Sequence, residues 1–206
     1  SSGVRLFQVQ TSEKVPTRVV LTAQGTAGHG SLPRADNPVV RLARAITRLA
    51  EADQPVSLST TTRRYLREIS GLPDYQWLRQ LLPMLEDASS APAAARAVLS
   101  KDSEIDAILH TTVSPTMLDA GVKINVIPNT AGAQVDVRRL PNETREEVMA
   151  RFRRIINDTS VKVEAAGGQD MPSTEPSSLT TPLYLAMEKV FSRAQPKGVV
   201  VPYMTR

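Results

Sequence analysis

Apolar and polar residues alternate along several short stretches of the chain. Residues 4–10 alternate in part, and residues 18–24 form a run rich in β-branched side chains that ends at a glycine cluster. Residues 110–118, 123–138 and 161–164 show the same pattern further on, the second being interrupted by a proline. Alternation over four to eight residues is typical of half-buried strands, so these stretches are predicted strands.

Two other segments carry apolar residues at helical spacing behind a clear start signal. The first begins at Asn37-Pro38, where Asn37 can accept hydrogen bonds from the first free amides and Pro38 suits the first helical position. Its predicted inward face consists of Val39, Leu42, Ala43, Ile46 and Leu49. The second begins behind Thr144, which has capping-box spacing with Glu147, and ends near Asn157. Both are predicted to be amphipathic helices that cover a sheet.

Residues 55–108 follow a different sequence pattern. Helical stretches are broken by prolines, and the apolar residues suit the core of a small helical subdomain. We interpret them as an insertion. With the insertion removed, the order is β-α-β-β-α-β, which predicts an α+β, ferredoxin-like domain with an antiparallel sheet and two helices on one face. This domain spans residues 15–168. A leading segment, residues 1–14, precedes it, and residues 169–206 hold a linker, a helix and a strand.

Composition excludes several classes of function. Cysteine is absent, so disulfides, cysteine-zinc sites and thiol nucleophiles are excluded. No apolar run approaches the roughly 20 residues of a membrane span, and we expect no membrane partner. The net charge of +4 is spread over the 206 residues without a nucleic-acid motif, so we expect no nucleic-acid partner. The only histidines are His29 and His110, too few for a usual catalytic zinc site of this chain alone.

The first candidate site is a glycine-rich loop, residues 25–33, at the end of a predicted strand. Gly28 and Gly30 flank His29, and they let the backbone turn tightly while the imidazole stays accessible. A phosphate-binding loop is an alternative, although neither G-x-G-x-x-G nor a Walker lysine is present. A purely structural or exposed histidine is the other alternative.

Two further segments, N-V-I-P from Asn125 and D-V-R ending at Arg138, carry the remaining candidates. Asn125 offers an amide, and Arg138 offers a guanidinium fork that suits a carboxylate. A salt bridge between Arg138 and Asp136, or a plain surface position, is the alternative for the arginine.

The three segments occur together and in order: G-x-x-G-H-G-S-x-P-x-x-x-N-P, then N-V-I-P, then D-V-R-x-L-P. This set resembles the zinc aminoacylase/carboxypeptidase metallopeptidase family, which includes acetylornithine deacetylase, succinyl-diaminopimelate desuccinylase, glutamate carboxypeptidase and carboxypeptidase S-like enzymes. The resemblance runs from residue 4 to about residue 205. It implies that residues 15–168 are the lid, or dimerisation, domain. The two flanking segments would then belong to the catalytic domain of a longer protein.

The resemblance also implies roles. His29 would reach into a partner's active site to polarise the scissile carbonyl, Asn125 and Arg138 would bind the substrate's carboxylate, and Gly28 and Gly30 would shape the loop. The intact protein would be a homodimer that binds two zinc ions and hydrolyses a small peptide or N-acyl amino acid.

The family's metal ligands do not occur in this sequence. The only Glu pair, Glu146-Glu147, opens a capped helix, where it complements the helix dipole. We therefore expect this fragment to bind no zinc and to be inactive alone. The alternative is a free-standing ferredoxin-like module that binds a small molecule without catalysis. The compartment stays open, with the cytoplasm favoured over secretion.

Overall fold

The centre of the molecule is a four-stranded antiparallel sheet of order β4-β6-β2-β7. The computed structural model describes residues 4–167, 171–172 and 174–206. The strands are β2 (Val15–Gln24), β4 (Thr112–Ala120), β6 (Thr130–Arg139) and β7 (Val161–Ala165), and the helices α1 (Pro38–Glu51) and α6 (Arg145–Ile156) share one core with them. The chain order β2-α1-β4-β6-α6-β7 confirms the predicted ferredoxin-like α+β fold.

Alternation along β2 and β6 creates this core. Leu21 of β2 and Val137 of β6 are fully buried under the helices, and the residues between such positions face the helix-free side of the sheet. The predicted inward face of α1 was partly wrong, because Ala45 is buried in place of Ala43 and Val39 is exposed. The helix is therefore rotated slightly, with Leu42 and Leu49 still inward.

Both predicted helix starts are confirmed. The Asn37 side chain accepts a hydrogen bond from the Val39 amide at 3.0 Å. Thr144 and Glu147 form a full capping box, which accounts for the only Glu pair as a helix-start feature. At the other end, α6 stops at Asn157, whose φ of 47° lies in the left-handed region.

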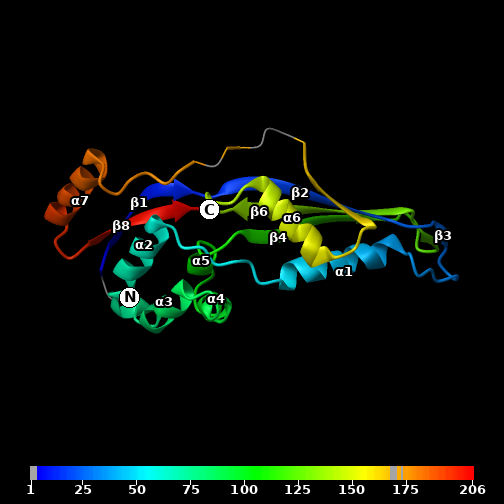
Figure 1. Ribbon diagram of the computed structural model, residues 1–206, viewed down its shortest axis with the longest axis horizontal. Coiled ribbons are helices and arrows are strands. Elements are labelled where there is room, and N and C mark those ends of the chain that lie inside the picture. Colours follow the sequence, from blue (N-terminus) through cyan, green and yellow to red (C-terminus); the bar gives the residue numbers. More distant parts are fainter. Residues whose placement is uncertain (1–3, 168–170, 173) are drawn as a thin grey trace.

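A second unit stands beside the sheet. Strand β1 (Leu6–Glu13) pairs in parallel with β8 (Val199–Thr205), and helix α7 (Pro182–Ala194) rests on the pair through a Phe7–Phe191 ring stack with centroids 4.7 Å apart. The C-terminal piece thus packs on the leading segment (Figure 1). The linker expected at 169–178 lies partly outside the described residues.

The insertion is helical, as predicted. It consists of α2 (Thr60–Ser70), η1 (Pro73–Tyr75), α3 (Leu78–Glu86), α4 (Ala91–Leu99) and α5 (Ser103–Asp106). These helices form a second hydrophobic core that also takes in Val201 and Met204 of β8. The insertion therefore packs on the β1–β8 pair rather than on the helices of the sheet (Figure 1). No helix in the described part of the chain is long and apolar enough to cross a membrane.

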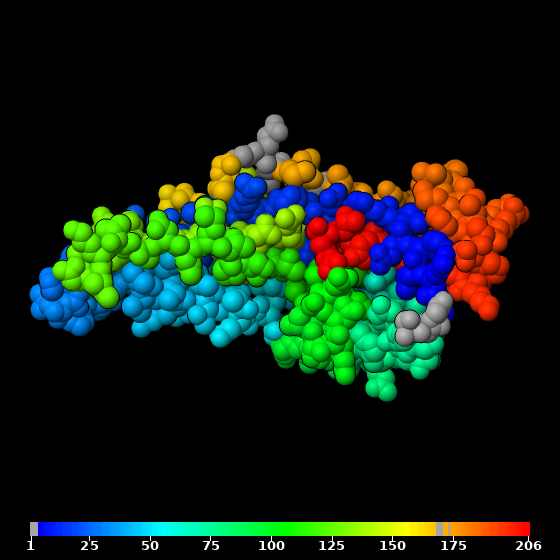
Figure 2. Space-filling model, turned by 180° about the vertical axis from the view of Figure 1, so that it is seen from behind, coloured from blue at the N-terminus to red at the C-terminus, as the bar shows by residue number. Residues whose placement is uncertain are grey.

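The far end of the sheet carries a small ribbon. Strand β3 (Gly28–His29) pairs antiparallel with β5 (Val126–Ile127). The sequence predicts one interrupted strand over 123–138, and Pro128 divides it into β5 and β6. Figures 1 and 2 both place this end, which we call the tip (residues 25–33 and 119–130), far from α7.

Candidate functional site

The tip brings together most of the residues that the sequence singles out. The register of β3 and β5 sets His29 directly opposite Val126 and Gly28 opposite Ile127. The Gly30 amide donates to the Asn125 carbonyl at 2.8 Å, so the histidine loop and the N-V-I-P segment are hydrogen-bonded to each other. Both His29 and Asn125 are exposed at this end of the molecule. An accessible imidazole and an accessible carboxamide thus lie on neighbouring segments of the tip.

The imidazole of His29 is held by its own turn. The Ser31 amide donates to Nδ1 of His29 at 3.2 Å, and the Ser31 hydroxyl lies 2.7 Å from the same nitrogen. A ring nitrogen that accepts from a backbone amide carries no proton, so in the neutral ring the proton sits on Nε2. The loop therefore presents an N–H donor outward.

Close packing against the backbone explains two glycines of the loop, Gly25 and Gly30, whereas Gly28 faces the Arg34 side chain. A Cβ at Gly30 would lie 3.3 Å from the backbone of Asn125, and one at Gly28 would lie 3.3 Å from Arg34. The strictest position is Gly25, where a Cβ would lie 2.0 Å from the Asp36 carbonyl oxygen. Asp36 closes the loop by accepting from the Thr26 amide, and hydrogen bonds from Thr26 hold the pKa of Asp36 below its usual value.

Arg138 lies elsewhere. It stands near the opposite end of β6, on the helix-free face, and its Nε donates to Asp136 Oδ2 at 3.0 Å. Eight residues at about 3.3 Å each separate it from Thr130 beside the tip, a distance of roughly 26 Å. Within one chain, Arg138 and His29 are therefore too far apart to contact the same small molecule.

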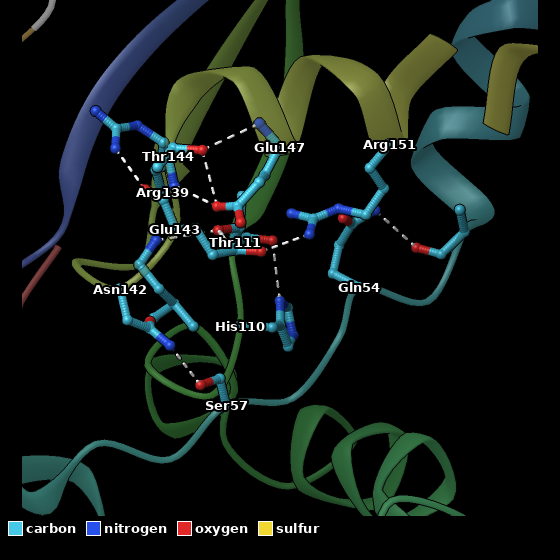
Figure 3. Close-up of polar contacts among 12 residues, drawn as sticks. Gln54, Ser57, His110, Thr111, Arg139, Asn142, Glu143, Thr144, Glu147 and Arg151 are labelled. Carbon is cyan, nitrogen blue, oxygen red and sulfur yellow. Dashed lines mark hydrogen bonds and ion pairs between the residues drawn. The ribbon is translucent and has the colours of Figure 1, made fainter. Parts of the chain in front are cut away.

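A buried polar network, which sequence reasoning missed, joins the sheet to the insertion (Figure 3). Glu143 accepts from the Thr111 hydroxyl and forms an ion pair with Arg151 of α6. Thr111 accepts from the Leu140 amide at 3.0 Å. Within the described residues, Nε and Nη2 of Arg151 and Oε1 of Gln54 are buried without a hydrogen-bond partner, and Figure 3 shows the Gln54 carboxamide pointing toward the Arg151 guanidinium.

Lys14, between β1 and β2, belongs to the same junction. Its ammonium donates to the carbonyls of Ala107 and His110, both at 2.8 Å, and to the Thr112 hydroxyl at 3.2 Å. Burial lowers the pKa of Lys14 from 10.5 to about 7, although Asp106 opposes the shift. His110, the second histidine of the sequence, is part of this junction, with Nε2 3.2 Å from the Asp106 carboxylate.

No metal centre is found in the part of the chain that the structure describes. No group of three or more His, Asp or Glu side chains there is placed to hold an ion. His29 lies at the tip and His110 at the junction between sheet and insertion. The residues described here thus do not fit the zinc ions that the family resemblance implies.

Fold and tip together define a ferredoxin-like lid domain. Residues 11–164 match the M20 peptidase dimerisation domain, and the chain belongs to that family. It is 30% identical over 201 residues to probable carboxypeptidase S-like 2 of Dictyostelium discoideum, covering 96% of this chain and 37% of that protein. It is 28% identical over 173 residues to the human N-fatty-acyl-amino acid synthase/hydrolase PM20D1, covering 82% and 33%. The chain thus spans about a third of the length of these relatives.

Solved structures agree on the fold. The M20 family metallo-carboxypeptidase Sso-CP2 from Sulfolobus solfataricus aligns with a TM-score of 0.55 at 18% identity, over 95% of this chain and 53% of that one. Human carnosine dipeptidase 1 aligns with a TM-score of 0.50 at 13% identity, over 95% and 50%. The sequence-based assignment to this hydrolase family and to its lid domain is confirmed.

Proposed function

We propose that this chain is the lid and dimerisation region of a zinc-dependent amidohydrolase or peptidase that cleaves an amide bond of a carboxylate-bearing substrate. The observation that carries the proposal is the tip, where His29 and Asn125 are both exposed on segments that the Gly30–Asn125 backbone hydrogen bond joins.

The task assigned to His29 follows from its tautomer. Its outward Nε2–H is suited to donate to the carbonyl oxygen of the scissile bond and to the oxyanion that forms from it. Ser31 keeps Nδ1 occupied and so holds the ring in this orientation. Asn125, beside it, is assigned to orienting the amide and the carboxylate of the substrate.

Arg138 is assigned to the substrate's carboxylate, which its planar fork suits. Because roughly 26 Å separates it from the tip, we assign His29 and Asn125 of one chain and Arg138 of a second chain to the same substrate. Each active site is then completed across a homodimer.

The dimer is assigned to the β4 edge of the sheet. That edge exposes Met117 and Leu118, with 58% and 69% of their surfaces accessible. The opposite edge, β7, carries the exposed ion pair Lys162–Glu164, and charged side chains of this kind discourage strand pairing. An apolar edge on a domain of the dimerisation family is the natural contact for a second copy.

Metal chemistry is assigned to residues outside the described part of this chain, because the described residues hold no suitable cluster. The role of this chain is confined to binding, orienting and polarising the substrate. For the substrate we propose small peptides or N-acyl amino acids, in keeping with relatives that are named a carboxypeptidase and an N-fatty-acyl-amino acid hydrolase.

The test is the His29→Ala variant of the full-length protein. We expect kcat for amide hydrolysis to fall by about 100-fold or more, as for loss of one oxyanion donor, with metal content and dimerisation unchanged. Glu146→Ala in the first turn of α6 is a control that leaves kcat unchanged. Wild-type turnover by His29→Ala would refute the assignment.

A further inference from the structure

The turn between β4 and β5, residues 121–125, holds the two most exposed large apolar side chains in the described part of the chain. Val122 is 94% accessible and Ile124 is fully exposed, with the exposed Lys123 between them. Gly121 has a φ of 71°, in the left-handed region that glycine tolerates, and the amide of the first β5 residue donates to the Lys123 carbonyl at 3.1 Å. The turn therefore has a defined shape, and it presents one cationic side chain between two apolar ones.

A cleft of about 460 Å³ lies at the other end of β4, between the sheet and the insertion. Its apolar lining comes from the end of α1, from α4 and from the start of β4, and includes Leu49, Pro92, Ala95, Leu99 and Val113. Leu99 is 53% accessible although its side chain is large and apolar. The cleft therefore presents apolar surface to solvent, and covering such surface is favourable because it releases water.

The charged side chains of the cleft favour a cation. Asp53 forms an ion pair with Arg96, and the Asp106 carboxylate lies 3.2 Å from Nε2 of His110. The remaining carboxylate of the lining, Glu51, is exposed. It is the last residue of α1, where the negative end of the helix dipole adds to its charge. A lysine between two apolar side chains is therefore complementary to this cleft.

Within one chain the turn and the cleft are far apart. Helix α1 runs from the tip, where Pro38 lies against Gly25, to the cleft at Glu51. Its length is roughly 20 Å at 1.5 Å per residue. Figure 2 shows β4 and the turn after it, in green, along one face of the molecule from the insertion to the tip. The turn therefore does not reach the cleft of its own chain.

A twofold contact at the β4 edge brings the turn of one chain to the cleft of another. Edges related by such an axis run antiparallel, and each contact between two residues occurs twice. When Leu118, the more exposed of the two apolar edge residues, lies at the axis, Val122 stands beside Ser114 of the second chain, because each is four residues from the axis. Ile124 stands beside Thr112 in the same way. Both Ser114 and Thr112 line the cleft.

We propose that the β4–β5 turn of each chain docks into the cleft between sheet and insertion of a second copy of this chain. Val122 and Ile124 cover the apolar lining, and Lys123 pairs with Glu51. The inference rests on the proposed function, in which a second copy contacts the β4 edge, and it adds the helical insertion to the dimer contact.

The docking also fixes which ends of the two sheets meet. Thr112, at the start of β4, is the register partner of Arg138 on β6. A turn seated beside Thr112 therefore brings the tip of one chain, with His29, toward the Arg138 end of the other chain's sheet. The insertion thus holds the two halves of the proposed active site in register.

The first test is the dimer dissociation constant of the full-length protein, measured by analytical ultracentrifugation. Lys123→Glu and Glu51→Lys should each raise it by about tenfold or more, because like charges then meet in both symmetric contacts. The double variant Lys123→Glu/Glu51→Lys should return it to within about threefold of the wild-type value, since the reversed pair attracts again. Lys162→Glu, at an exposed lysine of the opposite edge, is the matched control and should leave the constant unchanged.

A second test measures the contact directly. In the Leu99→Cys/Val122→Cys variant of the full-length protein, both positions are exposed, and a short bifunctional maleimide should link two chains into a covalent dimer. Neither single variant should give more covalent dimer than the wild type, because each position lies far from its own copy across the axis.

A charge-reversed double variant that dimerises no more tightly than its single variants would overturn the docking and leave the proposed function standing. Failure of Leu99→Cys/Val122→Cys to form more covalent dimer than its single variants would do the same. A wild-type full-length protein that stays monomeric at micromolar concentration would overturn the dimer of the proposed function itself.

Discussion

Glu143 connects several residues of the buried junction. Its carboxylate accepts from Thr111 and pairs with Arg151, and its backbone carbonyl accepts from Arg139. Such an ion pair adds modest net stability while intact, because two charges lose their hydration. Removing one partner is different, since the other charge stays buried without compensation.

Glu143→Ala should therefore lower the free energy of unfolding by about 3 kcal/mol or more. Urea denaturation of the full-length protein measures it. Arg154→Ala, on the exposed side of the same helix, is the matched control and should cost less than about 1 kcal/mol. Equal, small losses of unfolding free energy in both variants would contradict this stabilising role of Glu143 in the junction.

The sequence predicts the burial of some individual residues, but it does not predict the buried polar network. Alternation along β6 places Arg139 on the same side as Val137, so its burial is readable from the pattern. The junction residues Lys14, Glu143 and Arg151 come from separate segments and carry no pattern of their own. Only their meeting in three dimensions makes them a network.

Among the elements, the joint between β1 and β2 has the clearest consequence. Lys14 is the single residue between β1 and β2 in the chain, and its ammonium also donates hydrogen bonds to carbonyls at the end of the insertion. With a folded pKa of about 7 and an unfolded value near 10.5, the unfolded chain binds more protons between these two values. The contribution of Lys14 to stability therefore rises as pH rises from 7 to 10.

Lys14→Met should remove this rise. The unfolding free energy of the wild type should gain up to about 1.4 kcal/mol per pH unit relative to the variant over that interval. Urea midpoints at pH 7, 8.5 and 10 measure the difference. Parallel pH profiles for the two proteins would contradict the burial argument. The interval stops at pH 10 because Tyr65, whose pKa is raised to about 12 by burial, acts in the opposite sense above it.

Element types were largely predictable because the helix starts carry capping signals and the strands alternate. The separation of β5 from β6 follows from Pro128, which interrupts the predicted strand. The docking of the insertion on β1 and β8 was not predictable, because its apolar residues fit any apolar surface equally well. The order of elements along the chain does not determine which surface the insertion packs against.

For the whole molecule, the proposed dimer contact at the β4 edge predicts which substitutions weaken dimerisation. Leu118→Asp, which adds a charge to the apolar β4 edge, should raise the dimer dissociation constant of the full-length protein by at least about tenfold, because like charges meet across a twofold contact. Analytical ultracentrifugation measures it. Lys162→Glu on β7 is the control and should leave the dimer intact. Dissociation by the control and not by Leu118→Asp would assign the interface to the other edge.

The central claim is that each active site takes His29 and Asn125 from one chain and Arg138 from the other. It rests on two facts: the tip holds the first pair, and Arg138 stands roughly 26 Å away on the same sheet. Two chains that each lack one of these residues should therefore complement each other, since one of the two sites in a mixed dimer receives both intact residues.

The most direct measurement is the amidohydrolase activity of mixed dimers purified by two different tags. Dimers of a His29→Ala chain and an Arg138→Ala chain should recover about half of the wild-type activity. Dimers of a wild-type chain with a His29→Ala/Arg138→Ala chain should be nearly inactive. The reverse result, with no recovery in the first mixture and half activity in the second, would contradict the account by placing both residues in one chain's own site.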